Sequence, residues 1–253
     1  MLKTNVAVIL AAGLGTRLNS ISGFLPKPLV RFEGVPLLEH VMSGAKQAGV
    51  ERFVIVLGHQ GNMVRRWFAE SRLRSTPVTW VENPDYHKKN GISLLTARHA
   101  VDRPFLLLMS DHIFEPRTAA CLLRERLEKD EAILAVDHKL DCIFDMDDAT
   151  KVVRVGDYVS SIGKTLKRYD AVDTGMFLCS TAVFDALAAV VKDGNCSLSE
   201  GMQYMASNRK LRAYDIGDAI WQDIDTPEML DFAQVQRSPH YSHLSRVEEV
   251  ASV

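Results

Sequence analysis

Short, almost continuous apolar runs alternate with longer stretches whose apolar residues recur every three or four positions. The runs are rich in Val, Ile and Leu and predict strands buried on both faces at residues 5–10, 53–57, 78–81, 104–109 and 133–136. The stretches between them have helical spacing and predict helices at residues 36–49, 62–71, 91–101 and 118–129. This alternation indicates an α/β fold with helices on both faces of a mostly parallel sheet.

After about residue 140 the pattern changes to short segments of alternating character separated by turn residues. They predict strands of a small antiparallel excursion from the sheet at residues 151–155, 158–162 and 173–179. The remaining elements are helices at residues 182–191 and 198–207, a strand at 211–216 and a helix at 227–237. We therefore expect a single Rossmann-like sheet in one domain over residues 1–237, followed by a loose tail over 238–253.

Composition narrows the possible functions. The chain has 253 residues, a net charge of −2 and no basic block, which argues against a nucleic-acid partner. Its 4 cysteines form no C-x-x-C pair and no zinc spacing. No apolar run approaches the roughly 18 residues that a membrane span needs, and the N-terminal run is too short for a signal peptide. We expect a cytoplasmic protein without a membrane span.

The strongest chemical signal is the segment LAAGLGTRLNSISGFLPKP at residues 10–28. Its turn is rich in small residues, whose backbone N–H groups can approach phosphate oxygens closely. Arg17 offers a forked donor to a phosphate chain, and Lys27, flanked by two prolines, offers a point charge. Leu18 breaks the Rossmann dinucleotide fingerprint, and the G-K-[ST] of a P-loop is absent. An incidental glycine turn remains the alternative. The predicted nucleotide-binding positions of this segment are Leu10, Ala11, Ala12, Gly13, Gly15 and Thr16.

Acidic residues follow two other apolar segments. Asp111, in FLLLMSDH, comes at the end of a predicted buried strand, where ligand sites of open α/β sheets lie. Asp223 and Asp225 follow a short apolar stub in IWQDIDTPEML. These carboxylates suit Mg²⁺, although Asp111 could instead cap a helix and Asp225 could be the N-cap before Pro227. His112 either touches a substrate or makes a structural hydrogen bond.

The combination of A-A-G-L-G-T-R-L with a later P-K-P-L resembles the sugar-phosphate nucleotidyltransferases, and the resemblance extends over most of the chain. It implies that the glycine-rich loop wraps a nucleoside triphosphate and that Arg17 holds the phosphates that leave as pyrophosphate. Lys27 would stabilise charge at the α-phosphate, and one Asp from each acidic segment would bind Mg²⁺, Asp223 matching better than Asp225. Catalysis would then consist of alignment and charge neutralisation.

The same resemblance assigns the two substrates to the rest of the pocket. The residues implied for the nucleobase are Asn83, Asn90, Gly91 and Ser93. Those implied for a phosphorylated acceptor are Lys164, Asp173, Thr174, Gly175 and Glu200. Two of them have simpler alternatives: Lys164 could be a solvated turn residue, and Glu200 could complete a helix capping box with Ser197.

Within this family, N-G-x-S-L-L with S-D-H and I-G-K…V-D-T-G most resembles cytidylyltransferases that act on inositol 1-phosphate. The implied reaction is CTP plus inositol 1-phosphate to CDP-inositol plus pyrophosphate, with a separate membrane CDP-alcohol phosphotransferase downstream. Phosphocholine, a phosphonate or a sugar 1-phosphate are alternative acceptors, and a non-catalytic nucleotide-sugar sensor is the alternative to an enzyme. The chain departs from the inositol pattern at Ile92 and in a longer loop between Arg17 and Pro26.

Overall fold

The computed structural model describes residues 4–18, 23 and 25–237. The loop that follows Arg17 and the tail over 238–253 therefore lie largely or wholly outside the described residues. The strands are β1 (Val6–Ala11), β2 (Arg31–Phe32), β3 (Val35–Pro36), β4 (Arg52–Leu57), β5 (Val78–Glu82), β6 (Phe105–Met109), β7 (His112–Phe114), β8 (Ala132–Asp137), β9 (Lys151–Val155), β10 (Tyr158–Gly163), β11 (Ala171–Cys179), β12 (Leu211–Asp215) and β13 (Trp221–Asp223). The α-helices are α2 (Leu37–Gln47), α3 (Gly61–Glu70), α4 (Asn90–Thr96), α5 (Pro116–Leu122), α6 (Ala182–Val190), α7 (Leu198–Ser207) and α8 (Pro227–Arg237). The 3₁₀ helices are η1 (Thr16–Leu18), η2 (Lys27–Leu29), η3 (Ala97–Ala100) and η4 (Leu140–Cys142).

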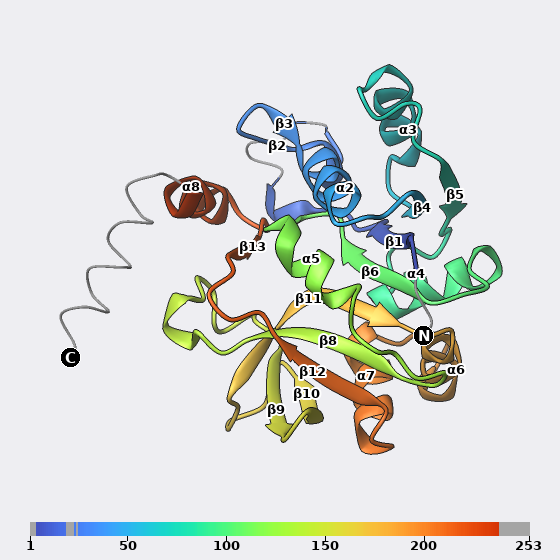
Figure 1. Cartoon of the computed structure of the whole chain (residues 1–253). Coiled ribbons are helices and arrows are strands. Elements are labelled where there is room, and N and C mark those ends of the chain that lie inside the picture. Colours follow the sequence, from blue (N-terminus) through green and yellow to red (C-terminus); the bar gives the residue numbers. More distant parts are fainter. Residues whose placement is uncertain (1–3, 19–22, 24, 238–253) are drawn as a thin grey trace.

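A nine-stranded sheet runs through the described part of the chain in the order β5-β4-β1-β6-β11-β8-β12-β10-β9 (Figure 1). Its central strand β1 sends alternate side chains into two cores. Val6, Val8 and Leu10 pack with residues of α4, α6 and α7, whereas Ala7 and Ile9 pack with residues of α2, α3 and α5. Because both faces are covered, an apolar side chain is favourable at every position, which explains the unbroken run in the sequence.

The sheet is mixed, and its antiparallel strands are the three that the sequence predicts, but β11 lies inside the main sheet. Strands β5, β4, β1 and β6 are parallel, but β11 lies antiparallel between β6 and β8. Strand β12 is parallel to β8, and β10 and β9 complete the sheet in antiparallel pairs. The strands after residue 140 are thus inserted into the main sheet, which a pattern of local periodicity cannot reveal.

Two further differences concern local elements. Helix α5 ends at Leu122, before the stretch 123–129 that the spacing of Leu residues assigns to it, and Leu127 is buried from an irregular segment instead. The sequence pattern gives no sign of β7 and marks β13 only as a short apolar stub. Both strands are three residues long, and they pair with each other. Their pairing matters for function because it sets Asp223 opposite His112. None of the helices described here is long and apolar enough to cross a membrane.

Candidate active site

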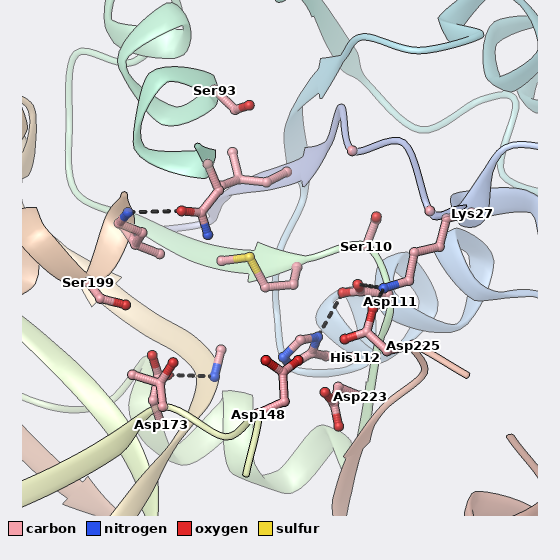
Figure 2. A pocket seen from close by; sticks show the side chains of 18 of the residues that line it. Lys27, Ser93, Ser110, Asp111, His112, Asp148, Asp173, Ser199, Asp223 and Asp225 are labelled. Atoms are coloured by element: carbon pink, nitrogen blue, oxygen red, sulfur yellow. Dashed lines mark hydrogen bonds and ion pairs between the residues drawn. The ribbon is translucent and has the colours of Figure 1, made fainter. Parts of the chain in front are cut away.

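A polar pocket of about 470 Å³ opens where β1 and β6 end (Figure 2). The loop after β1, the β6–β7 turn and the start of α4 line one part of it. The segment before β9, the turn after β10, strand β11 and strand β13 line the rest. Its position at the carboxyl ends of parallel strands is the usual place of a ligand site in open α/β sheets.

The glycine-rich loop forms the floor of this pocket. Its lining residues include Leu10, Ala12, Gly13, Gly15 and Thr16. Ala11, which the sequence also assigns to the nucleotide, is buried in the core that contains α2 and does not line the pocket, because side chains of β1 alternate between faces.

A glycine is required at position 15 for two reasons. Its φ is +62°, a conformation that other residues rarely adopt. A Cβ atom there would also lie 2.6 Å from Cβ of Lys27. Gly15 thereby allows the P-K-P segment to pack directly on the glycine-rich loop, and the two halves of the sequence motif meet in space.

Lys27 lies between two carboxylates at the centre of the pocket. Its Nζ donates to Asp111 and, at 2.5 Å, to Oδ1 of Asp225. Burial alone would lower the pKa of Lys27, but these two carboxylates outweigh burial and hold the pKa above its usual value. Burial would likewise raise the pKa of Asp111, but Lys27 and His112 outweigh it and hold this pKa well below its usual range.

Ion pairs continue from Asp225 through Arg17 to the far side of the pocket. Nη2 of Arg17 lies 2.9 Å from Oδ2 of Asp225 and 3.1 Å from Oδ2 of Asp148. The other oxygen of Asp148 accepts from Lys164, whose bond is the main cause of the lowered pKa of Asp148. Each of the three cations that the sequence assigns to phosphates is therefore held by a carboxylate. In order, the chain of ion pairs runs Lys164, Asp148, Arg17, Asp225, Lys27, Asp111 and His112.

The acidic residues of the pocket fit a metal ion that is also coordinated by substrate phosphates. Among the described residues, no three His, Cys, Asp or Glu side chains form a ready-made metal cage. Asp111, Asp223 and Asp225 nevertheless line the same pocket. Burial raises the pKa of Asp223, and although His112 opposes this, repulsion from Asp225 and Asp111 adds to it. A cation would relieve that repulsion, and Mg²⁺ commonly takes one or two protein carboxylates together with substrate phosphates.

The acceptor residues implied by the sequence fall into two groups. Lys164, Asp173 and Gly175 line the pocket, and burial raises the pKa of Asp173 to about 6. Thr174 does not line it, because strand alternation turns its side chain inward, where Oγ1 donates to the carbonyl of Ala135 at 2.8 Å.

Glu200 also lies outside the pocket lining. It makes both bonds of a capping box with Ser197 at the start of α7, and its carboxylate pairs with Lys89 at 3.2 Å. The backbone N–H of Ser197 is the main cause of its lowered pKa. These contacts match the simpler alternative that the sequence left open for Glu200.

Of the residues that the sequence assigns to the nucleobase, two line the pocket and two lie behind its wall. Asn90 and Ser93, both on α4, line the pocket. Asn83 is buried behind them and donates to Oγ of Ser93 at 2.9 Å. Gly91 packs on a neighbouring turn, since a Cβ there would lie 2.6 Å from the carbonyl oxygen of Cys196. Asn83 and Gly91 thus support the wall that presents Asn90 and Ser93.

Several polar lining residues have no counterpart in the sequence prediction. They are Tyr86, Lys88, Ser110, Asp145, Asp148 and Ser199. Ser110 and Lys88 adjoin predicted motifs and could have been included by proximity. Asp145 and Asp148 lie in a loop without motif or periodicity, and only the fold brings that loop to the pocket.

Three comparisons with known proteins agree with this geometry. The family model for the MobA-like NTP transferase domain matches residues 7–206. A bifunctional IPC transferase and DIPP synthase of Rubrobacter xylanophilus is 36% identical over 230 residues, which cover 90% of this chain and 51% of that protein. The chain therefore spans about half the length of this relative. A 2-aminoethylphosphonate cytidylyltransferase of Lancefieldella rimae is 36% identical over 165 residues, or 61% of each chain.

Comparison with solved structures also points to a nucleotidyltransferase fold. The solved structure of the inositol-1-phosphate CTP transferase from T. maritima matches with a TM-score of 0.83 and 27% identity, covering 98% of this chain and 97% of that one. The predicted α/β nucleotidyltransferase fold is confirmed, with the sheet mixed as described above. Because the family model matches most of its length, the chain belongs to the MobA-like NTP transferase domain family and is a nucleotidyltransferase-family enzyme.

Proposed function

We propose that the protein is an Mg²⁺-dependent cytidylyltransferase that converts CTP and inositol 1-phosphate into CDP-inositol and pyrophosphate. The observation that carries this proposal is the convergence of Arg17, Lys27 and Lys164 on one pocket that also contains three carboxylates suited to Mg²⁺. Two anionic substrates need such separated cations, and the name of the similar T. maritima protein points to CTP and inositol 1-phosphate.

The binding step exchanges carboxylate partners for phosphates. Arg17 releases Asp225 and Asp148 and turns its forked donors to the phosphates that will depart. Lys27 stays in place and neutralises charge that builds up at the α-phosphate. Lys164, on the opposite side of Asp148, holds the phosphate of the acceptor.

The chemical step needs no strong base, because the acceptor phosphate is already an anion. One of its oxygens attacks the α-phosphorus in line and forms the new P–O bond. The bond from the α-phosphorus to the bridging oxygen breaks, and that oxygen leaves with pyrophosphate. Bound Mg²⁺, held by Asp111 with Asp223 or Asp225, would supply charge neutralisation of the phosphates during this step.

The remaining acidic groups favour an acceptor rich in hydrogen-bond donors. Asp148 pairs with Lys164, and Asp145 and Asp173 line the same pocket. Carboxylates accept hydrogen bonds from the hydroxyl groups of a polyol such as inositol. They would equally suit an ammonium group, so an aminoalkylphosphonate is the second candidate acceptor, in agreement with the cytidylyltransferase of Lancefieldella rimae.

The test is pyrophosphate release by the purified protein with Mg²⁺. CTP, UTP, dTTP, ATP and GTP are each paired with inositol 1-phosphate, phosphocholine, 2-aminoethylphosphonate and glucose 1-phosphate. Release with CTP and inositol 1-phosphate alone is expected. Release with another pair would keep the mechanism and replace the substrates, whereas no release with any pair would favour a nucleotide-sugar sensor.

A further inference from the structure

His112 adjoins the proposed metal ligand Asp111 and is held on several sides. Its Nδ1 lies 2.7 Å from Oδ1 of Asp111. Because the carboxylate of Asp111 is an acceptor, Nδ1 carries the hydrogen and donates it. This bond occupies one carboxylate oxygen and fixes the direction of the other, which faces Lys27 in the centre of the pocket (Figure 2).

The imidazole ring of His112 contacts an indole and a glycine. Trp221 stacks on it with 5.9 Å between ring centroids and 23° between planes. On Gly175 a Cβ atom would lie 2.5 Å from Cδ2 and Nε2 of His112. Gly175 has a φ of +73°, so both its conformation and its contact with the ring require glycine. The ring therefore has little freedom to rotate away from Asp111.

The indole is itself anchored to the end of β8. Its Nε1 donates to Oδ2 of Asp137 at 2.9 Å, and the side chain of Asp137 is only 3% exposed. Lys139 braces the same carboxylate, with Nζ 2.7 Å from Oδ1 of Asp137. Nζ of Lys139 also donates to the carbonyls of Gly217 and Ala219, which fixes the turn that leads to β13. The contacts of Lys139 thus hold both the carboxylate that binds the indole of Trp221 and the turn that precedes Trp221.

We propose that Trp221 and Gly175 clamp His112 so that its Nδ1–H fixes Asp111 as a metal ligand, with Asp137 and Lys139 anchoring the clamp. His112, Trp221 and Asp137 are then positioning residues, which act on the metal through Asp111. Hydrogen bonds from outside groups orient metal-binding carboxylates in the same way in other metal sites, and their loss typically costs about 10–100-fold in metal affinity or activity. This inference rests on the proposed function, since it requires that Asp111 binds the metal.

Binding of Mn²⁺ alone, followed by the electron paramagnetic resonance signal of the free ion, tests the inference without turnover. His112→Ala is expected to weaken Mn²⁺ binding about 10–100-fold. His112→Asn keeps an N–H at the position of Nδ1 and is expected to bind Mn²⁺ nearly as the wild type does. Trp221→Phe keeps a stacking ring but loses the bond to Asp137, so its loss should be smaller than that of His112→Ala.

The matched control is Trp80→Phe, the same change at a tryptophan that packs on Phe68 away from the pocket. It is expected to leave Mn²⁺ affinity and the Mg²⁺ concentration for half-maximal rate unchanged. If His112→Ala binds Mn²⁺ as the wild type does, or if His112→Asn is as weak as His112→Ala, the clamp does not position the ligand. A wild-type protein that neither binds Mn²⁺ nor releases pyrophosphate would instead refute the proposed function, and this inference with it.

Discussion

Lys27→Ala tests two proposed roles of one side chain, the stabilisation of the folded protein and the stabilisation of charge during the reaction. The ammonium of Lys27 lies between Asp111 and Asp225, and only 10% of its side chain is exposed. Removal of this cation leaves two carboxylates facing each other, with side chains 18% and 23% exposed. The substitution should therefore lower both the stability of the folded protein and the rate of the reaction.

The expected magnitudes follow from this burial. Removing one partner of a buried ion pair costs about 3–5 kcal/mol because the remaining charge is uncompensated. Since both carboxylates retain some contact with water, we expect a value near the lower end, about 3 kcal/mol. The loss of one preorganised charge stabiliser should lower kcat by about 10²–10³-fold.

The effect of Mg²⁺ on stability distinguishes repulsion between the two carboxylates from simple loss of packing. With Lys27 gone, the paired carboxylates become a stronger cation site, so Mg²⁺ should stabilise the variant more than the wild type. At a concentration of 100 times its Kd, a bound ion adds about 2.7 kcal/mol.

The assay is urea unfolding at pH 7.5 with and without Mg²⁺, alongside pyrophosphate release. Lys129→Ala, at an exposed lysine in the turn before β8, is the control and should change stability by no more than about 0.5 kcal/mol. An unchanged unfolding midpoint for Lys27→Ala, or equal effects of Mg²⁺ on both proteins, would refute the argument from charge.

Three further predictions concern the acceptor side of the pocket. Because the folded-state pKa of Asp173 is raised to about 6 from an ordinary 3.8, its ionisation penalises folding above pH 6 and the penalty fades as pH falls toward 4. Asp173→Asn should therefore raise the free energy of unfolding at pH 8, by at most about 3 kcal/mol, and by less at pH 5, as urea titrations at the two pH values will show. Asp148→Asn frees Arg17 and Lys164 from pairs worth up to about 1 kcal/mol each, so pyrophosphate should bind several-fold more tightly by calorimetry. Glu200→Ala should cost about 1 kcal/mol in urea unfolding through loss of the capping box, and an increase of more than a few-fold in the KM for the acceptor would contradict its structural role.

Much of the site was predictable because its chemistry is local in the sequence. The turn after β1 needs small residues wherever a backbone approaches phosphates, and Arg17 follows within the same segment. Asp111 comes directly after a buried strand, so its place at the carboxyl edge of the sheet follows from the strand alone. The flanking prolines marked Lys27 as a phosphate-binding cation, and the family resemblance gave it its role at the α-phosphate. The contact of Gly15 with Lys27 shows why the two motifs occur together.

Other features could not be predicted because they arise from contacts between distant segments. Asp148 joins Arg17 to Lys164, but no local pattern marks the loop that carries it. The insertion of β11 between β6 and β8 is a choice of topology, which alternation of apolar residues does not encode. Thr174 and Asn83 lie in or near the motifs, yet their polar groups bond within the protein and do not face the pocket. Whether such a side chain faces the pocket or the interior depends on its direction, which the sequence does not give.

The alternating charges of the pocket explain how one site can hold so many ionised groups. Lys27, Arg17 and Lys164 each neutralise a carboxylate, whereas burial raises the pKa values of Asp173 and Asp223. A nucleotide with its Mg²⁺ brings both signs at once: phosphates for Arg17 and Lys27, and a metal for Asp111, Asp223 and Asp225. Either part alone would leave one set of charges uncompensated. The pocket should therefore favour the metal–nucleotide complex over the free nucleotide or the free ion, because only the complex satisfies both sets of groups.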